Sequence, residues 1–221
     1  IHAALAVLDK TLAFTPKLLD ALYQCTSCGA CDVRCKRNLD VEVLGVIEAL
    51  KVKAAAEGKS PAGYKALADT VSRSKNIYGA PNENRRQWLT KEIQPAPKAD
   101  VAYFVGCRAS FEDKQIASAT ARILSSNTQF RLLDNEWCCG HTQFATGQWQ
   151  AAGEMVEHNL KAIESSGAKM IVTSCAECYK TLKVDYPRIL GKSTSDMGYT
   201  VLHITEYVDQ WLKGGSYKFH Q

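Results

Sequence analysis

Five cysteines in the second half of the chain constrain its fold and chemistry more than any other feature. They follow the pattern Cys-x30-Cys-Cys-x35-Cys-x2-Cys, and they are Cys107, Cys138, Cys139, Cys175 and Cys178. Thiolates are soft ligands that bind iron–sulfur clusters, zinc and copper(I). One or two buried cysteines pack as small hydrophobic side chains, but an adjacent pair combined with Cys-x2-Cys is a ligand pattern. The sequence therefore predicts a metal or cluster site rather than disulfides or core thiols.

Each group of these cysteines follows a short apolar run that is typical of a buried strand. Strand-like runs alternate with helical patterns at residues 101–105, 116–125, 130–133, 147–165, 169–173, 179–186, 201–204 and 206–213. This alternation predicts βαβ units and a parallel, Rossmann-like α/β layer. Ligands of such sheets bind beyond the carboxyl ends of the strands. We therefore expect the three cysteine groups to meet at that edge.

A second cysteine motif lies near the start of the chain. Its spacing is Cys-x2-Cys-x2-Cys-x3-Cys, formed by Cys25, Cys28, Cys31 and Cys35. This is the bacterial ferredoxin spacing for a cubane 4Fe-4S cluster, whereas a zinc ribbon needs two separated Cys-x2-Cys pairs. In two-cluster ferredoxins the fourth cysteine ligates the other cluster. Either Cys35 completes this cubane, or it belongs to a cluster whose other ligands lie upstream of Ile1.

The five-cysteine pattern resembles the cysteine-rich CCG domain of the heterodisulfide reductase and glycolate oxidase iron–sulfur subunit family. The stretches that carry the likeness are residues 104–107, 137–140 and 173–179. The resemblance implies that the five cysteines hold a noncubane 4Fe-4S cluster, with a zinc site as the alternative. Such families usually carry two ferredoxin-type runs and two CCG repeats. We expect that this chain is either a one-repeat protein or lacks an upstream run and a second repeat.

The first part of the chain is predicted to be helical. Helices are expected over residues 1–13, from Pro16 with Thr15 as the N-cap, over residues 43–57, and from Pro61 onward. Prolines between residues 94 and 98 mark a boundary. We place a helical ferredoxin-type cluster domain at 1–94 and a cysteine-rich CCG α/β domain at 95–221.

The sequence also suggests roles for individual residues near the cysteine motifs. Arg85, Arg86 and Trp88 are predicted to form a solvated helical face, with docking of a partner subunit as the alternative. Cys178 should open a helix, whose positive end favours the thiolate. His141 could bind the metal or carry a proton, unless it lies beside the ligands or at the surface. Trp137, Cys138's neighbour, is expected to shield a cluster.

Composition limits the class of protein. The chain has 221 residues and a net charge of +4, without a block of like charges, so nucleic acid is not an expected partner. No apolar run reaches the ~18 residues of a membrane span. Nine cysteines in ligand patterns suit a reducing compartment. We expect a cytoplasmic protein that reaches a membrane only through a partner, although a signal could precede Ile1.

These features predict an iron–sulfur electron-transfer subunit of a larger oxidoreductase, with no catalytic residue assigned. The sequence lacks the G-x-G-x-x-G dinucleotide fingerprint. By resemblance, flavoprotein and/or membrane electron-transfer subunits are the expected partners. Disulfide or heterodisulfide reduction at the five-cysteine cluster is the more specific possibility. The alternatives are a zinc-stabilised, non-catalytic scaffold with one ferredoxin-type cluster, and a thiol redox sensor that uses Cys138 and Cys139.

Overall fold

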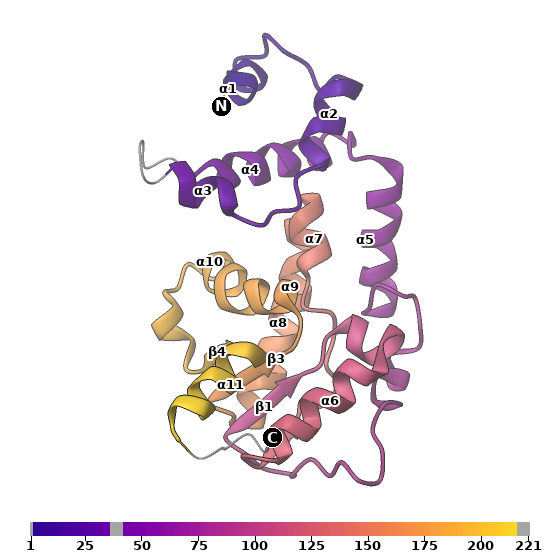
Figure 1. Cartoon of the computed structure of the whole chain (residues 1–221). Coiled ribbons are helices and arrows are strands. Elements are labelled where there is room, and N and C mark those ends of the chain that lie inside the picture. Colours follow the sequence, from indigo (N-terminus) through magenta and orange to yellow (C-terminus); the bar gives the residue numbers. More distant parts are fainter. Residues whose placement is uncertain (1, 36–41, 216–221) are drawn as a thin grey trace. The chain divides into compact units, whose positions relative to one another are not determined.

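The computed structural model describes residues 2–35 and 42–215, which form two compact units (Figure 1). One unit combines Ile1–Asp69 with Thr142–Ala152, and the other combines Thr70–His141 with Gly153–Gln221. The α-helical start followed by a parallel α/β region confirms the predicted fold class. The functional domains proposed at 1–94 and 95–221 stay a prediction.

Short helices make up the first unit. They are α1 (His2–Leu8), α2 (Pro16–Tyr23), α3 (Ala30–Cys35), α4 (Val43–Ala56) and the first part of α5 (Ala62–Ser74). Apolar side chains of α1, α2 and α4 share one core, formed by Ala4, Val7, Leu22, Tyr23, Leu50 and Ala54. As predicted, Thr15 caps α2: its hydroxyl accepts a hydrogen bond from the Leu18 amide at 3.2 Å. The predicted helix over 1–13 is too long, because α1 ends at Leu8 and Lys10 adopts a left-handed φ of 59°.

A returning segment, Thr142–Ala152, completes this unit. It contains most of α7 (His141–Thr146) and the start of α8 (Trp149–Ser166). Gly147, with φ of 81°, approaches α4 so closely that a Cβ atom there would lie 2.3 Å from the carbonyl oxygen of Lys51. Only glycine allows this contact. The sequence patterns did not predict α7.

Four parallel strands form the sheet of the second unit. They are β1 (Val101–Phe104), β2 (Phe130–Leu132), β3 (Met170–Thr173) and β4 (Thr200–His203), in the order β2-β1-β3-β4. Val101 aligns with Phe130 on one side and with Met170 on the other, so the central strands end close to the same level. The sheet therefore presents one carboxyl edge, as the sequence predicts.

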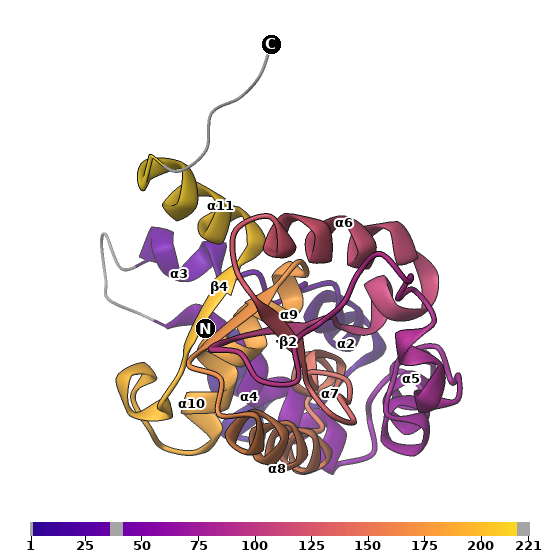
Figure 2. The ribbon, with the colours of Figure 1, turned by 90° about the horizontal axis from the view of Figure 1, so that it is seen from below.

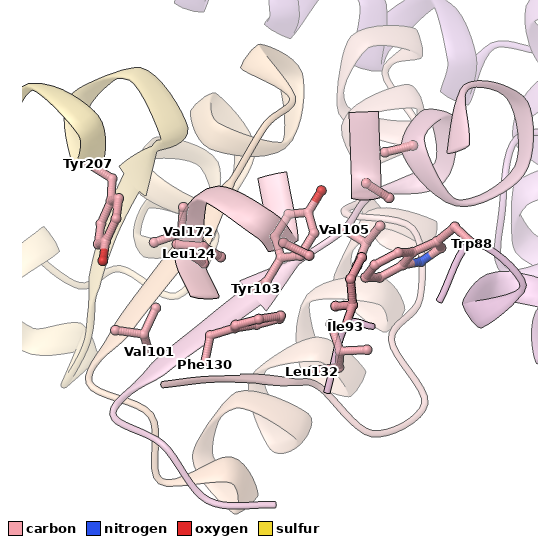
Figure 3. Packing of buried hydrophobic residues seen from close by; sticks show 13 residues of the cluster. Trp88, Ile93, Val101, Tyr103, Val105, Leu124, Phe130, Leu132, Val172 and Tyr207 are labelled. Carbon is pink, nitrogen blue, oxygen red and sulfur yellow. The ribbon is translucent and has the colours of Figure 1, made fainter. Parts of the chain in front are cut away.

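Helices cover both faces of this sheet (Figure 2). On one side lie α6 (Lys114–Ser125) and α11 (Ile204–Lys213), and on the other lie α8 and α10 (Tyr186–Ile189). Alternate strand residues such as Val101 and Tyr103 enter a core with Leu124 of α6 and Tyr207 of α11 (Figure 3). Burial on both faces explains why the two central strands, β1 and β3, are almost continuously apolar.

Irregular helical turns connect the regular elements near the carboxyl edge. Besides α9 (Ala176–Lys180), they are the 3₁₀ helix Asn82–Arg86 and the π-helical turns Arg108–Glu112 and Thr181–Asp185. Another 3₁₀ helix, Thr194–Met197, directly precedes β4 at the opposite edge. The prediction of a solvated face at residues 85–88 is wrong for two of its three members. Arg85 is 4% exposed and Trp88 3% exposed. Trp88 packs edge-on against Tyr103, with ring centroids 6.1 Å apart. Among the described residues, no helix is long and apolar enough to cross a membrane.

Candidate metal centre

The five cysteines of the second unit lie just beyond the ends of three strands. Cys107 follows β1, Cys138 and Cys139 follow β2, and Cys175 and Cys178 follow β3. Four of them are buried, and Cys175 is half-buried. Parallel strands bring these segments, which are remote in sequence, to one edge.

The five thiols interact with one another in a continuous row. Cys107 interacts with Cys138, Cys138 with Cys139, and Cys178 with both Cys139 and Cys175. The sequence prediction that the three groups meet is thus realised in the fold. Their role as ligands stays a prediction.

Cysteine thiolates bind both zinc ions and iron–sulfur clusters. Among the described residues, no group of three or more His, Cys, Asp or Glu side chains is placed to hold a single ion. Structural zinc takes four ligands around one point. An iron–sulfur cluster spreads its thiolates over several iron atoms. Thiolate sulfur is the donor type of iron–sulfur clusters, so the chemistry of the five cysteines suits such a cluster.

The contacts among the thiols lower the pKa values of some of these cysteines and raise those of others. Hydrogen bonds from Cys138 and Cys178 lower the pKa of Cys139 to about 6, and a hydrogen bond from Cys178 lowers the pKa of Cys175 to about 6. The pKa values of Cys107 and Cys178 are raised because their hydrogen bonds to neighbouring cysteines stabilise the protonated thiol and because burial disfavours the thiolate. Cys107 lowers the pKa of Cys138, but the contact with Cys139 and burial outweigh it and raise that pKa. Metals bind the thiolate form of cysteine, so the lowered pKa values of Cys139 and Cys175 favour metal binding.

Backbone N–H groups also point at the sulfurs. The amides of Ile77, Gly140 and His141 donate to Cys107, Cys138 and Cys139 respectively. Those of Glu177 and Cys178 donate to Cys175. Such N–H donors stabilise negative charge on sulfur and tune iron–sulfur clusters. The backbone therefore suits an anionic cluster at this edge.

Gly106 fixes the spacing between two cysteine groups. A Cβ atom at this position would lie 3.0 Å from the sulfur of Cys178, and the backbone has φ of 77°. Both the close approach and the left-handed conformation favour glycine. The loop after β1 can therefore bring Cys107 beside the row without a side chain in the way.

A buried ion pair holds the loops that carry Cys107 and Cys138. Arg85 and Glu136 lie 3.0 Å apart, with side chains 5% and 3% exposed. The Glu136 carboxylate accepts hydrogen bonds from the amides of Val105 at 2.8 Å and Gly106 at 2.9 Å. Sequence reasoning missed both residues as part of the site. The available signal was an acidic residue, Glu136, directly before Trp137 and Cys138.

Asn159 on α8 holds the adjacent cysteine pair from the other side. Its side chain accepts from the Trp137 amide at 3.0 Å and donates to the Cys138 carbonyl at 2.9 Å. It also donates to the Tyr186 hydroxyl at 3.0 Å. Trp137 stacks on His158, with ring centroids 3.5 Å apart. No sequence pattern pointed to Asn159.

The structure changes the interpretation of Cys178 and His141. The helix α9 begins at Ala176, so that Cys175, and not Cys178, stands at its N-cap. Cys175 receives the amide donors and the lowered pKa that had been expected for Cys178. The ring of His141 lies 3.5 Å from the Thr181 hydroxyl and 3.9 Å from the Glu177 carboxylate. Of the alternatives, the position beside the cysteines matches these contacts.

The ferredoxin-type motif belongs to the first unit and lies nearer the surface. Cys25, Cys31 and Cys35 are half-buried, Cys28 is exposed, and Cys35 is the last residue of α3. The Ser27 amide lies 3.4 Å from the sulfur of Cys25, and the Ala30 amide lowers the pKa of Cys28. Gly29 and Ser27 both have positive φ, so the loop turns tightly between cysteines. The loop thus has the donor set of a cubane site, and its ligand roles stay a prediction.

Comparison with known proteins identifies the region that carries the five cysteines. The family model of the cysteine-rich domain CCG matches residues 101–183, which contain all five cysteines of the row. Residues 101–183 form a CCG domain. The resemblance to that domain is therefore confirmed, and the CCG domain coincides with the strands β1, β2 and β3.

Two relatives of this CCG-domain chain are named as reductase subunits, and another is named only as an iron–sulfur protein. A subunit of the dihydromethanophenazine:CoB–CoM heterodisulfide reductase of Methanosarcina barkeri is 31% identical over 91% of this chain and 50% of its own length. A subunit of the fumarate reductase (CoM/CoB) of Methanothermobacter marburgensis is 31% identical over 76% of this chain and 34% of its own length. An uncharacterized iron–sulfur protein of Methanococcus maripaludis is 26% identical over 84% of this chain and 36% of its own length.

The chain is thus homologous to iron–sulfur oxidoreductase subunits of the heterodisulfide reductase type. It spans about half of the length of the heterodisulfide reductase relative. No solved structure gives a significant match to the chain.

Proposed function

We propose that this chain is an electron-transfer iron–sulfur component of a multi-subunit oxidoreductase. It passes electrons between a cubane 4Fe-4S cluster and a second, noncubane 4Fe-4S cluster. The cubane is held by Cys25, Cys28, Cys31 and Cys35, and the second cluster by Cys107, Cys138, Cys139, Cys175 and Cys178. When bound, each cluster supplies the site that accepts and releases single electrons.

The observation that carries this proposal is the continuous row of five thiols at the sheet edge. Five soft donors with amide hydrogen bonds suit an anionic cluster with several iron atoms. The names of the relatives place them in disulfide and fumarate chemistry. Reduction of a disulfide at the second cluster is the specific reaction that the likeness to heterodisulfide reductase supports. A flavoprotein or membrane electron-transfer subunit is the proposed partner.

A matched pair of variants tests the two-cluster assignment. Cys139→Ser removes a ligand of the row, whereas Cys28→Ser removes a ligand of the ferredoxin-type loop. In protein purified anaerobically and reduced with dithionite, electron paramagnetic resonance should show two cluster signals in the wild type. Cys139→Ser should remove the second signal and leave the cubane signal, and Cys28→Ser should do the reverse.

Two results would contradict the proposal. If Cys139→Ser keeps both signals, the row does not hold a cluster. If the wild type contains stoichiometric zinc without the second iron–sulfur signal, the site is a zinc-stabilised scaffold.

A further inference from the structure

Arg85 places a buried positive charge against the row of thiols. One of its terminal nitrogens, Nη2, lies 3.8 Å from the sulfur of Cys107, and the residue is 4% exposed. Charged side chains are almost never buried without partners. Arg85 belongs to a segment that contains no cysteine, so its position is not a consequence of the ligand motif.

The guanidinium of Arg85 is held in a single orientation by hydrogen bonds on its other N–H groups. Nε donates to Asn82 at 3.2 Å, Nη1 to Glu136 at 3.0 Å, and Nη2 to the Lys75 carbonyl at 3.2 Å. The planar donor fork of arginine suits such a network. The contact with Cys107 is therefore directed rather than incidental.

The two charged side chains of the Arg85–Glu136 ion pair contact different parts of the site. Arg85 reaches the sulfur of Cys107, whereas Glu136 accepts from the amides of Val105 and Gly106. Arginine stays protonated in proteins, and the Glu136 carboxylate 3.0 Å away pairs with the buried guanidinium. The cation is thus the member of the pair that touches a proposed ligand.

Resting on the function proposed above, we infer that Arg85 is a positioning residue that raises the reduction potential of the five-cysteine cluster. Reduction adds one electron, and therefore one negative charge, to the cluster. An N–H donor to sulfur and a nearby positive charge stabilise the reduced form more than the oxidised form. The effect is strong here because a buried site screens charge weakly. The negative charge of Glu136 has the opposite effect and lowers the reduction potential.

Redox titration of the full chain, followed by electron paramagnetic resonance, tests this inference. Arg85→Gln removes the charge and should lower the equilibrium constant for reduction of the second cluster about tenfold, or about 59 mV for one electron. Arg85→Lys keeps the charge but loses the fork, so its potential should lie closer to that of the wild type than to that of Arg85→Gln. Glu136→Gln removes the opposing charge and should shift the potential upward. The cubane potential serves as an internal reference.

Arg108→Gln is the matched control. Arg108 is next to Cys107 in sequence, but its side chain is 67% exposed and pairs with Glu112. Water screens such a charge, so this variant should keep the wild-type potential. A merely structural Arg85 would give equal shifts in Arg85→Gln and Arg85→Lys, and that result would overturn the inference.

Glu136→Gln keeps the inference testable if Arg85→Gln does not retain the cluster. A potential in Glu136→Gln that is unchanged or lower than the wild type overturns it. If the wild type has no second cluster signal, the proposed function fails instead. Unchanged potentials in variants with intact clusters refute the role of Arg85 alone.

Discussion

Gly106 is the residue at which the geometry of the site is least tolerant. We predict that Gly106→Ala removes the second cluster, because the new Cβ atom would lie 3.0 Å from the sulfur of Cys178. The left-handed backbone adds about 1–2 kcal/mol of strain. Iron content should fall to that of the cubane, and denaturant unfolding should give a reduced stability.

Gly198→Ala separates these two effects. Gly198 also has a positive φ, of 74°, but a Cβ atom there would meet no atom within 4 Å. Gly198→Ala should lose stability as Gly106→Ala does, but it should keep the iron of the second cluster. Equal iron loss in both variants would show that backbone strain, rather than the crowded sulfur, explains the effect.

At this scale, the cysteines could be predicted from sequence because ligand spacing is local information. Arg85 could not, since whether an arginine is buried depends on Glu136, which is 51 residues away. The same holds for Asn159, whose three partners come from two other segments of the chain. The reversed roles of Cys175 and Cys178 follow from a helix start that the sequence placed a few residues too late.

Among the elements, the strands were predictable because they are buried on both faces and appear as apolar runs. The turns around the cysteines were not, because α7 and the π-helical turn Arg108–Glu112 are too short to show a helical period. π-helical turns often occur at functional sites. The short turns around the cysteines are thus hard to predict from the sequence. The sheet that brings the cysteines together is much easier to predict.

The long helix α8 contributes to the site through Asn159. We predict that Asn159→Ala destabilises the second unit by about 1–3 kcal/mol, because it leaves buried polar partners unsatisfied. It should also weaken iron retention, since Asn159 holds the backbone of Trp137 and Cys138. Thermal unfolding and iron analysis measure the two effects.

Glu154→Ala is the control on the same helix, because Glu154 is exposed. It should leave stability and iron content unchanged. Wild-type iron retention in Asn159→Ala would contradict the proposed positioning of the cysteine pair by α8.

At the scale of the whole molecule, each compact unit is proposed to hold one cluster. The ferredoxin-type loop lies in the first unit and the thiol row in the second. The chain spans about half of its heterodisulfide reductase relative. Its substrate and partners therefore belong to the proposal, whereas the CCG domain and its parallel sheet are established.

The most direct test of the central claim is the metal content of the thiol row alone. In the double variant Cys28→Ser/Cys31→Ser the ferredoxin-type site is disabled, so the remaining metal reports the second site. After anaerobic purification, we predict about four irons and about four acid-labile sulfides per chain, without zinc. Stoichiometric zinc, or the absence of iron and sulfide, would contradict the claim that the row holds an iron–sulfur cluster.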